Sequence, residues 1–540
     1  MMNVQLLVSS LLEHAEKFFP KKEVISPMPS GIVRHTYAEI GKRTRQLSSA
    51  LEKIGIQRED RVGTLAWNHN RHLEVYFAAP GMGAVLHTIN IRLSPEHIVY
   101  IINHAEDKVL FIDEDILPLV ELIKDHLKSV EAFVIMTDKE ELPETTLEPV
   151  YSYEKLLQTG DEAYQFVKDI DENAPAGMCY TSATTGNPKG VVYSHRGIVL
   201  HSYALGLADT VGVSENDRVM PIVPMFHANA WGLPFAATWF GSTQVMPGPR
   251  FTPKILAQLI EEEKVTKTGG VPTICLALLK EWEEGNYDTS SLNAILCGGS
   301  AAPRGMIQTF EQKYNISFLH AYGMTETSPL ATFSRLKSYQ MDLSQEDKLD
   351  ERAKQGILVP GLEFKVIDGQ GEVEWDGKSM GELLIKGPWI ADEYYKDERT
   401  KEAFQDGWLH TGDVVTIDEE GVIKILDRTK DLIKSGGEWI SSVDLENALM
   451  AHEAVFEASV VAVPHAEWQE RPVACVVLKD SYKDNVTKED LLSFITPMFA
   501  KWWLPDDVVF MEEIPKTSVG KFLKRALREK LKDHFAAESL

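Results

Sequence analysis

Short apolar runs alternate with helix-length amphipathic segments from the start of the chain to about residue 425. The helical pattern Tyr37–Ile54 precedes the apolar run Asp60–Leu65, and the run Lys108–Ile112 precedes a helical pattern near Leu117–Leu127. Similar β-rich runs follow, several of them ending at Gly or Pro before a helix: Arg218–Val223, Val265–Gly270 and Leu292–Cys297. Repeated strand, turn and helix predict parallel sheets covered by helices, with ligands at the carboxyl ends of the strands.

The pattern changes towards the C-terminus. The segment Leu336–Lys354 is strongly charged and predicts a solvated face, either an exposed helix or a surface excursion. After Ile423–Lys434 the chain predicts a compact α+β unit of about a hundred residues, a common domain size. Its expected helices and strands are Val443–Met450, Ala458–Val463, Pro472–Leu478, Lys488–Phe499 and Val508–Met511. We therefore predict two domains, residues 1–426 and 427–540, the larger one with several packing units.

Composition and charge narrow the classes of function. The 540 residues exceed what one hydrophobic core supports. The 55 Lys and Arg residues are outnumbered by 81 Asp and Glu, which gives a net charge of −26 and disfavours nucleic acid as a partner. The four cysteines are widely spaced and indicate neither disulfides nor a zinc site. No apolar run is long enough for a transmembrane segment, and the amphipathic N-terminus has no basic leader, so the expected location is cytoplasmic.

The strongest local motif is Tyr180–Gly190, with the sequence YTSATTGNPKG. It contains hydroxyl side chains, glycines and one cation, the groups that bind a polyphosphate. They are Thr181, Ser182, Thr184, Thr185, Gly186 and Lys189. The spacing differs from a Walker A loop because Lys189 is followed by Gly190 and not by Ser or Thr. Composition alone leaves an ordinary Ser/Thr/Gly surface turn equally open.

This motif resembles the phosphate-binding motif of the adenylate-forming superfamily, which includes acyl-CoA synthetases, firefly luciferases and peptide-synthetase adenylation domains. Five further segments resemble the other motifs of that superfamily in the same order: Gly298–Pro303, Tyr322–Thr327, Thr411–Asp413, Asp427–Asp431 and Pro515–Lys521. Each motif is weak alone, and six in register are highly specific. Within the superfamily, Pro224–Trp231 and Lys434–Ser442 most resemble bacterial medium- and long-chain fatty acyl-CoA synthetases.

The resemblance implies a fold and a reaction. The fold is α/β, with a large N-terminal domain of parallel α/β sheets that carries a small β-subdomain, and a small mobile α+β C-terminal domain. The reaction is ATP-dependent: a carboxylic acid becomes an acyl-adenylate with release of pyrophosphate, and CoA then forms the acyl-CoA thioester with release of AMP. The implied partners are these small molecules and Mg²⁺, and a homodimer is left open.

The resemblance also assigns site residues. Lys521, Glu326 and Thr325 take catalytic roles, and Thr181 and Glu326 hold Mg²⁺. Asp413 accepts hydrogen bonds from the ribose hydroxyls. The remaining nucleotide contacts in the N-terminal domain are Gly299, Ser300, Ala301, His320, Ala321, Tyr322 and Gly323. Taken without the motif, Asp413 is a turn residue and Lys521 one solvated lysine of a basic tail.

In the C-terminal part, Asp427 resembles the hinge about which the small domain rotates between the two half-reactions. Ser435, Gly436 and Gly437 are assigned to the CoA face. Arg428, Lys430, Lys434 and Trp439 are assigned as nucleotide or adenylate contacts.

The acyl pocket is assigned to His227, Ala228 and Trp231, with Trp231 as a gate. A lone His and an aromatic residue after a strand are also ordinary core residues. The expected substrate is a medium- or long-chain fatty acid, and two other substrates stay open: a short thioether acid of the methylthiopropionate type and an aryl acid. Two other functions also stay open: a luciferase-type oxygenase and a non-catalytic nucleotide-binding homologue. One departure from the family is Ala183, which stands where Gly is usual and resists a positive φ.

Overall fold

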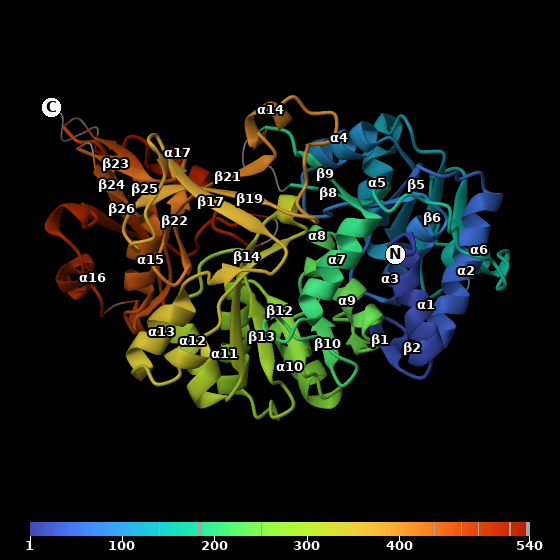
Figure 1. Cartoon of the computed structure of the whole chain (residues 1–540), viewed down its shortest axis with the longest axis horizontal. Coiled ribbons are helices and arrows are strands. Elements are labelled where there is room, and N and C mark those ends of the chain that lie inside the picture. Colours follow the sequence, from blue (N-terminus) through green and yellow to red (C-terminus); the bar gives the residue numbers. More distant parts are fainter. Residues whose placement is uncertain are drawn as a thin grey trace.

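The computed structural model describes residues 1–139, 141–181, 186–249, 251–436, 438–465, 467–483, 485–517 and 520–535. Four sheets organise the chain (Figure 1). In the view of Figure 1 the N-terminal part, in blue, lies at the right, and the C-terminal part, in orange and red, lies at the left. In the described part of the chain no helix is both long and apolar enough to cross a membrane.

The first sheet has seven strands in the order β7-β6-β5-β3-β4-β8-β9, all parallel except β9. Its strands are β3 (Arg61–Leu65), β4 (Val85–Thr88), β5 (Asp107–Asp113), β6 (Ala132–Met136), β7 (Val150–Ser152), β8 (Pro175–Tyr180) and β9 (Gly190–Ser194). The antiparallel pair β8 and β9 forms a hairpin, and its turn carries the Thr181–Lys189 motif.

The second sheet has nine strands in the order β16-β15-β14-β13-β12-β10-β11-β1-β2, with a parallel centre and antiparallel edges. Its strands are β1 (Glu23–Met28), β2 (Gly31–Thr36), β10 (Arg218–Pro221), β11 (Thr243–Val245), β12 (Lys267–Gly270), β13 (Ala294–Cys297), β14 (Ser317–Gly323), β15 (Leu330–Phe333) and β16 (Ile357–Leu358). The chain thus begins in the second sheet and enters the first one only at β3.

Helices cover both faces of these sheets. Side chains of alternate strand residues separate the two faces, because successive residues of a strand point in opposite directions. Val109 and Phe111 of β5 share one core cluster with α1, α2 and α3, while Leu110 and Ile112 share another with α4 and α5. The helices of the N-terminal part are α1 (Val8–Phe18), α2 (Tyr37–Lys53), α3 (Asn70–Gly81), α4 (Pro95–Ala105), α5 (Leu117–Ile123), α6 (Tyr153–Gln158), α7 (His195–Gly206), α8 (Ala228–Trp231), α9 (Leu233–Trp239), α10 (Pro253–Glu262), α11 (Pro272–Glu284), α12 (Arg304–Gln308) and α13 (Gln345–Ala353).

Two further sheets follow. A β-subdomain sheet pairs β17 (Glu363–Asp368), β18 (Gly371–Glu372), β19 (Met380–Lys386), β20 (Phe404–Gln405), β21 (Trp408–Ile417) and β22 (Ile423–Arg428), with α14 (Thr400–Ala403) beside it. The C-terminal sheet pairs β23 (Ile433–Ser435), β24 (Glu438–Ile440), β25 (Val455–His465), β26 (Gln469–Leu478) and β27 (Asp507–Phe510). Its helices are α15 (Ser442–Met450), α16 (Lys488–Ile495) and α17 (Lys524–Leu531).

The expected fold class is confirmed. The predicted strands and helices fall on observed elements with shifts of a few residues at the ends: the run Asp60–Leu65 is β3, and the pattern Tyr37–Ile54 is α2. The charged segment Leu336–Lys354 contains α13, whose only buried residue is Leu349. The boundary placed before Asp427 falls inside β22, and the change of sheet comes between Arg428 and Ile433. The four cysteines are buried free thiols.

Candidate active site

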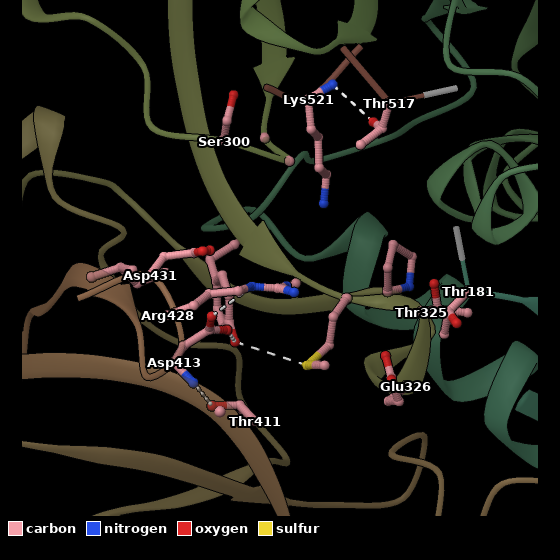
Figure 2. Close-up of a pocket in the computed structure, with 18 of the residues that line it drawn as sticks. Thr181, Ser300, Thr325, Glu326, Thr411, Asp413, Arg428, Asp431, Thr517 and Lys521 are labelled. Atoms are coloured by element: carbon pink, nitrogen blue, oxygen red, sulfur yellow. Dashed lines mark hydrogen bonds and ion pairs between the residues drawn. The ribbon is translucent and has the colours of Figure 1, made fainter. Parts of the chain in front are cut away.

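A cleft of about 700 Å³ lies where the first two sheets, the β-subdomain and the C-terminal unit meet (Figure 2). Segments distant in sequence line it, and most follow the carboxyl end of a strand, as expected for parallel sheets. The lining includes Thr181, Lys189, His227, Trp231, Gly299, Tyr322, Glu326, Asp413, Arg428 and Lys521. In Figure 2, Asp413 and Arg428 lie on one side, Thr181, Thr325 and Glu326 on the other, and Lys521 above the space between them.

One wall is lined by Thr181, Asn187 and Lys189, from the two ends of the connection between β8 and β9. Thr181 donates its backbone N–H to the carbonyl of Lys189 at 2.9 Å, and the Thr181 hydroxyl accepts the N–H of Lys189 at 3.1 Å. These two bonds bring the hydroxyl and the ammonium group of the motif to the same end of the hairpin. Gly186 has φ of +70°, a backbone conformation that favours glycine. Ser182, Ala183, Thr184 and Thr185 lie outside the described residues.

Lys189 and Glu326 meet through a third residue, Tyr394. The phenol of Tyr394 donates to Oε1 of Glu326 at 2.6 Å and accepts from Nζ of Lys189 at 2.7 Å. Nζ of Lys189 lies 3.8 Å from the same carboxylate oxygen. Burial, followed by the Glu326 charge, raises the pKa of Tyr394. The phenol therefore stays protonated and can donate a hydrogen bond to the Glu326 carboxylate. Burial lowers the pKa of Lys189, and Glu326 opposes this effect.

The turn that carries Glu326 is itself fixed by its surroundings. Thr325–Thr327 form a single 3₁₀ turn after β14, and Thr325 and Glu326 are both buried. Tyr193 donates its hydroxyl to the carbonyl of Thr325 at 2.9 Å, and the N–H of Ala391 donates to the carbonyl of Glu326 at 2.8 Å. The backbone of this turn is therefore held by the Tyr193 side chain on one side and the Ala391 backbone on the other, while the Glu326 side chain lines the cleft.

Asp413 on β21 forms the opposite end of the cleft. Its Oδ2 accepts the Tyr322 hydroxyl at 2.5 Å, and its Oδ1 lies 3.2 Å from Nε of Arg428 on the paired strand β22. Asp413, followed by other nearby groups, raises the pKa of Arg428, whereas burial raises that of Tyr322. A buried carboxylate held by a phenol and a guanidinium is fixed in orientation.

The wall between these two ends is built from glycine and small residues. A Cβ on Gly298 would lie 2.7 Å from the carbonyl oxygen of Ala321, and one on Gly323 would lie 1.7 Å from that of Pro329. Gly299 has φ of +87°. The other predicted wall residues, Ser300, Ala301 and His320, also line the cleft. His320 is buried, burial lowers its pKa to about 4, and its Nδ1 has no hydrogen-bond partner among the described residues.

Lys521 enters the cleft from the C-terminal unit. Its N–H donates to the Thr517 hydroxyl at 3.1 Å, and its carbonyl accepts the N–H of Thr517 at 2.7 Å. Its Cε lies 3.4 Å from the position a Cβ of Gly299 would take, so a larger residue at position 299 would crowd the lysine. Burial, followed by the charge of Arg428, lowers the pKa of Lys521 to about 8.

The opposite side of the wall is apolar. Trp231 lies 3.7 Å from the position of a Gly298 Cβ, and Leu205, Leu296, Ala321 and Leu330 also line this side of the cleft. Burial lowers the pKa of His227 to about 3, so this side chain is neutral at physiological pH. Ala228, Asn229, Ala230 and Trp231 form a turn with φ values between 42° and 58°, an unusual left-handed turn that the sequence did not predict.

Asp427 connects the N-terminal sheets to the C-terminal unit. Its Oδ2 accepts the N–H of Ser442 at 3.1 Å and the Ser442 hydroxyl, at the start of α15. Lys524 of α17 reaches Glu446 at 2.8 Å and the same Ser442 hydroxyl. Burial raises the pKa of Asp427, and the Lys524 charge opposes this effect. Lys430 also lines the cleft beside this junction.

Among the described residues, five of the predicted site residues do not line the cleft in this arrangement: Gly186, Lys434, Ser435, Gly436 and Trp439. Lys434 and Trp439 pair across the β23–β24 hairpin, with Nζ of Lys434 5.5 Å from the centre of the Trp439 ring, and both are exposed. Ser435 is buried and its hydroxyl accepts from Arg471 at 2.9 Å. Gly436 has φ of +60° and lies against the Trp468 ring. Gly437 lies outside the described residues.

Sequence reasoning missed the segment between β19 and α14. Tyr394 and Arg399 from this segment line the cleft, and the N–H of Tyr395 donates to the carbonyl of Gly190 at 2.9 Å. The local sequence, DEYYKDERT, is typical of a surface loop and gave no signal of this role.

Comparisons with known proteins agree with the motifs. A model of the AMP-binding enzyme family matches residues 12–395, and a model of the AMP-binding enzyme C-terminal domain matches residues 444–521. The chain is 51% identical to a long-chain-fatty-acid–CoA ligase of Thermus thermophilus, over 99% of this chain and 97% of that protein. It is 44% identical to a 3-methylmercaptopropionyl-CoA ligase of Ruegeria lacuscaerulensis, over 99% and 98%.

A medium-chain-fatty-acid–CoA ligase of Ectopseudomonas oleovorans is 42% identical over 99% of this chain and 97% of its own. Among solved structures, ATP-bound MatB from Rhodopseudomonas palustris superimposes with a TM-score of 0.82 at 25% identity, covering 98% of this chain and 99% of that one.

The hydrogen bonds of Tyr394 lead to a prediction about stability. Replacing Tyr394 by Phe removes the donor to a buried carboxylate, and we expect a loss of about 1–3 kcal/mol in the free energy of unfolding. The measurement is the urea midpoint of the first unfolding transition. Tyr395→Phe, next in sequence and only half-buried, is the matched control and should change the midpoint much less. Equal shifts for the two variants would contradict the role given to the Tyr394 hydroxyl.

Proposed function

The chain belongs to the AMP-binding enzyme family and is an AMP-forming acid–CoA ligase that uses ATP and CoA, and on this premise we propose that its acid is a medium- or long-chain fatty acid. The observation that carries the proposal is the apolar side of the cleft. Leu205, Trp231, Leu296 and Leu330 line the cleft and belong to one apolar cluster, which offers an aliphatic chain a surface to pack on. The relatives at 51% and 42% identity, named for long- and medium-chain fatty acids, support the same reading.

A short thioether acid is the second candidate. Trp231 lies close against Gly298 and narrows the apolar side of the cleft. If the tryptophan keeps this position when substrates bind, only a short acid fits beyond it. The relative named for 3-methylmercaptopropionate, at 44% identity, favours this candidate. A fatty acid requires Trp231 to move aside, which is the gating role we propose for it.

The first half-reaction brings two anions together, because the carboxylate must attack the α-phosphorus of ATP. Since like charges repel, the site must supply positive charge at the point of attack and exclude water. We propose that Lys521 bridges the attacking carboxylate and the α-phosphate. Its position beside Gly299, between the phosphate-loop end and the Asp413 end, supports this role. Thr325 and His227 would contact the α-phosphate and the acyl carboxylate respectively.

At the nucleotide, we propose that Asp413 accepts hydrogen bonds from the two ribose hydroxyls, which suit the two oxygens of a carboxylate. Arg428 and Lys430 add positive charge beside it. The small residues of the wall, Gly299, Ser300, Ala301, Ala321 and Gly323, would leave room for the flat adenine. Thr181, Lys189 and the rest of the phosphate loop would hold the triphosphate, including the segment 182–185 whose structure is not described.

The donor set fits Mg²⁺ bound together with ATP. Glu326 and Thr181 supply hard oxygen ligands on the same side of the cleft, and Mg²⁺ commonly combines one or two protein oxygens with substrate phosphates and water. We propose that these two residues hold the ion. When bound, Mg²⁺ would offset the charge of the phosphates. Tyr394 keeps Glu326 in place by donating its hydroxyl to it.

The second half-reaction needs a different face of the C-terminal unit. We propose that residues 427–540 rotate about Asp427 as a cap, withdraw Lys521, and bring Ser435, Gly436 and Gly437 to the cleft for CoA. The positions of Lys434 and Trp439 outside the cleft while Lys521 is inside support two alternative arrangements. The buried bonds from Asp427 to Ser442 would have to change in this rotation.

The acid is identified by a pyrophosphate-release assay with straight-chain acids of 2 to 18 carbons, methylthiopropionate and aryl acids, each with and without CoA. We expect the highest kcat/KM for a chain of about 8 carbons or longer, because each buried methylene adds about 0.8 kcal/mol of binding until the pocket is full. A maximum at methylthiopropionate with steep loss for longer chains would replace the first candidate by the second.

Replacing Lys521 by Ala separates the two half-reactions. We expect adenylate formation to fall by more than about a hundredfold, which is typical for loss of one charged stabilising group at the reacting centre. Thioester formation from supplied acyl-adenylate and CoA should stay within a few-fold of the wild-type rate. Each half-reaction is measured alone, and an equal loss in both would refute the role of Lys521.

The lowered pKa of Lys521 predicts a pH dependence. The lysine must be protonated to offset charge, so the single-turnover rate of acid-dependent pyrophosphate release at subsaturating ATP should be constant below pH 7 and fall as the pH rises through about 8. CoA is left out of this assay so that its thiol does not contribute. His227 is neutral throughout the range because its pKa is lowered to about 3. A profile that stays flat to pH 10 would be inconsistent with this account.

A further inference from the structure

The segment 391–399, here called the crossover segment, connects the β-subdomain to the phosphate loop. It follows β19 and the turn after it, and besides the Tyr394 hydroxyl bonds described above, bonds to backbone carbonyls of both regions hold it in place. The N–H of Ala391 donates to the carbonyl of Glu326 at 2.8 Å, and the N–H of Tyr395 donates to that of Gly190 at 2.9 Å. At its end, NH1 of Arg399 donates to the carbonyl of Asn187 at 3.1 Å. The segment therefore touches both the Glu326 turn and the loop that carries Lys189.

Arg399 presents its charge at the phosphate-loop end of the cleft. Its Nε donates to Asp397 Oδ1 at 2.8 Å, and NH2 also donates to Asp397, so one edge of the guanidinium is fixed. The other edge, NH1, faces the phosphate loop, 3.9 Å from the position a Cβ of Gly186 would take. The side chain is 38% exposed and lines the cleft.

The charge of Arg399 also acts on Lys189. After burial and the opposing effect of Glu326, the guanidinium is among the causes that lower the pKa of Lys189, so the two cations lie near each other. Two cations this close repel each other unless anions lie beside them. In the free protein, Glu326 pairs with Lys189 and Asp397 pairs with Arg399, which partly offsets this repulsion.

The order of groups along the cleft indicates what Arg399 binds. Asp413 lies at one end and Thr181 and Glu326 at the other (Figure 2), so a nucleotide whose ribose is at Asp413 directs its phosphates towards Lys189. Asn187 and Arg399 both line the cleft, and the bond between them places the guanidinium at the loop that carries Lys189. The outermost phosphates would therefore reach the guanidinium, whose planar N–H groups suit phosphate oxygens.

We propose that Arg399 binds the two outer phosphates of ATP and the pyrophosphate released from them. The inference rests on the proposed nucleotide orientation. No covalent step is assigned to the residue: it would hold the leaving group in line while the bond between the α- and β-phosphates breaks, and the pyrophosphate would carry away the electron pair of that bond. Since AMP lacks both phosphates, Arg399 should not contribute to binding AMP or acyl-adenylate.

Binding measurements on the full chain test this proposal. The dissociation constants of ATP, pyrophosphate and AMP are measured by calorimetry with Mg²⁺ present and acid and CoA absent. For Arg399→Gln we expect ATP and pyrophosphate to bind about tenfold more weakly, as for loss of a charged hydrogen bond. AMP should change less than about twofold, and the rate of thioester formation from supplied acyl-adenylate should be unchanged because pyrophosphate takes no part in it.

Two further variants serve as controls. Arg399→Lys keeps the charge without the planar fork and should fall between wild type and Arg399→Gln. Lys396→Gln removes a positive charge from the same segment at a residue that pairs with Glu106 on the surface, 51% exposed, and should leave all three constants unchanged.

Three outcomes would overturn the proposal. They are unchanged binding of ATP and pyrophosphate in Arg399→Gln, an equal loss for AMP, and the same loss in Lys396→Gln. An equal loss for AMP would indicate that Arg399 only braces the loop through Asn187. Failure of the proposed fatty-acid substrate is a separate result, because none of these binding measurements includes an acid.

Discussion

Electrostatic repulsion between substrates is the constraint on which the site depends. ATP, a carboxylate and CoA are all anions, and the chain that binds them carries a net charge of −26. The structure meets this constraint locally by placing cations beside carboxylates, such as Lys189 with Glu326 and Arg428 with Asp413. In the free protein each pair limits the cost of a buried charge. When phosphates bind, Lys189 and Arg428 can pair with the phosphate oxygens in place of these carboxylates.

The architecture explains why these pairs meet. Parallel strands carry their following turns to the same edge of a sheet, so the Thr181–Lys189 turn, the wall after β13 and the Glu326 turn reach one cleft from two sheets. The β-subdomain contributes Asp413 and Arg428 on neighbouring strands β21 and β22. Lys521 differs from these residues because it belongs to the C-terminal unit and not to the two N-terminal sheets or the β-subdomain. This division between a fixed site and a separate unit that carries the lysine suits a ligase with two half-reactions.

Sequence reasoning predicted the frame, and most of the residues that it assigned to the site line one cleft, for different reasons. Strands such as β3 and β13 were visible because buried runs and the turns after them are local patterns. Glu326, Asp413 and Lys521 were visible only through motifs. Tyr394 and Arg399 escaped because their roles depend on a crossover that no local pattern encodes. The left-handed turn 228–231 and the outward position of Trp439 likewise depend on tertiary packing and on the orientation of the C-terminal unit.

The central claim is that Lys521 and the β23–β24 hairpin use one cleft in turn, so fixing Lys521 inside should permit only adenylation. A disulfide between Thr273→Cys and Gly520→Cys tests this, because a Cβ at Gly520 would lie 3.2 Å from Oγ1 of Thr273. Gly520 has φ of +83°, so the Gly520→Cys single variant must be measured beside it. We predict that the oxidised double variant releases about one pyrophosphate per enzyme and makes no acyl-CoA until a reductant is added. If the variant with an intact disulfide formed acyl-CoA as fast as the same variant after reduction, the account would be contradicted.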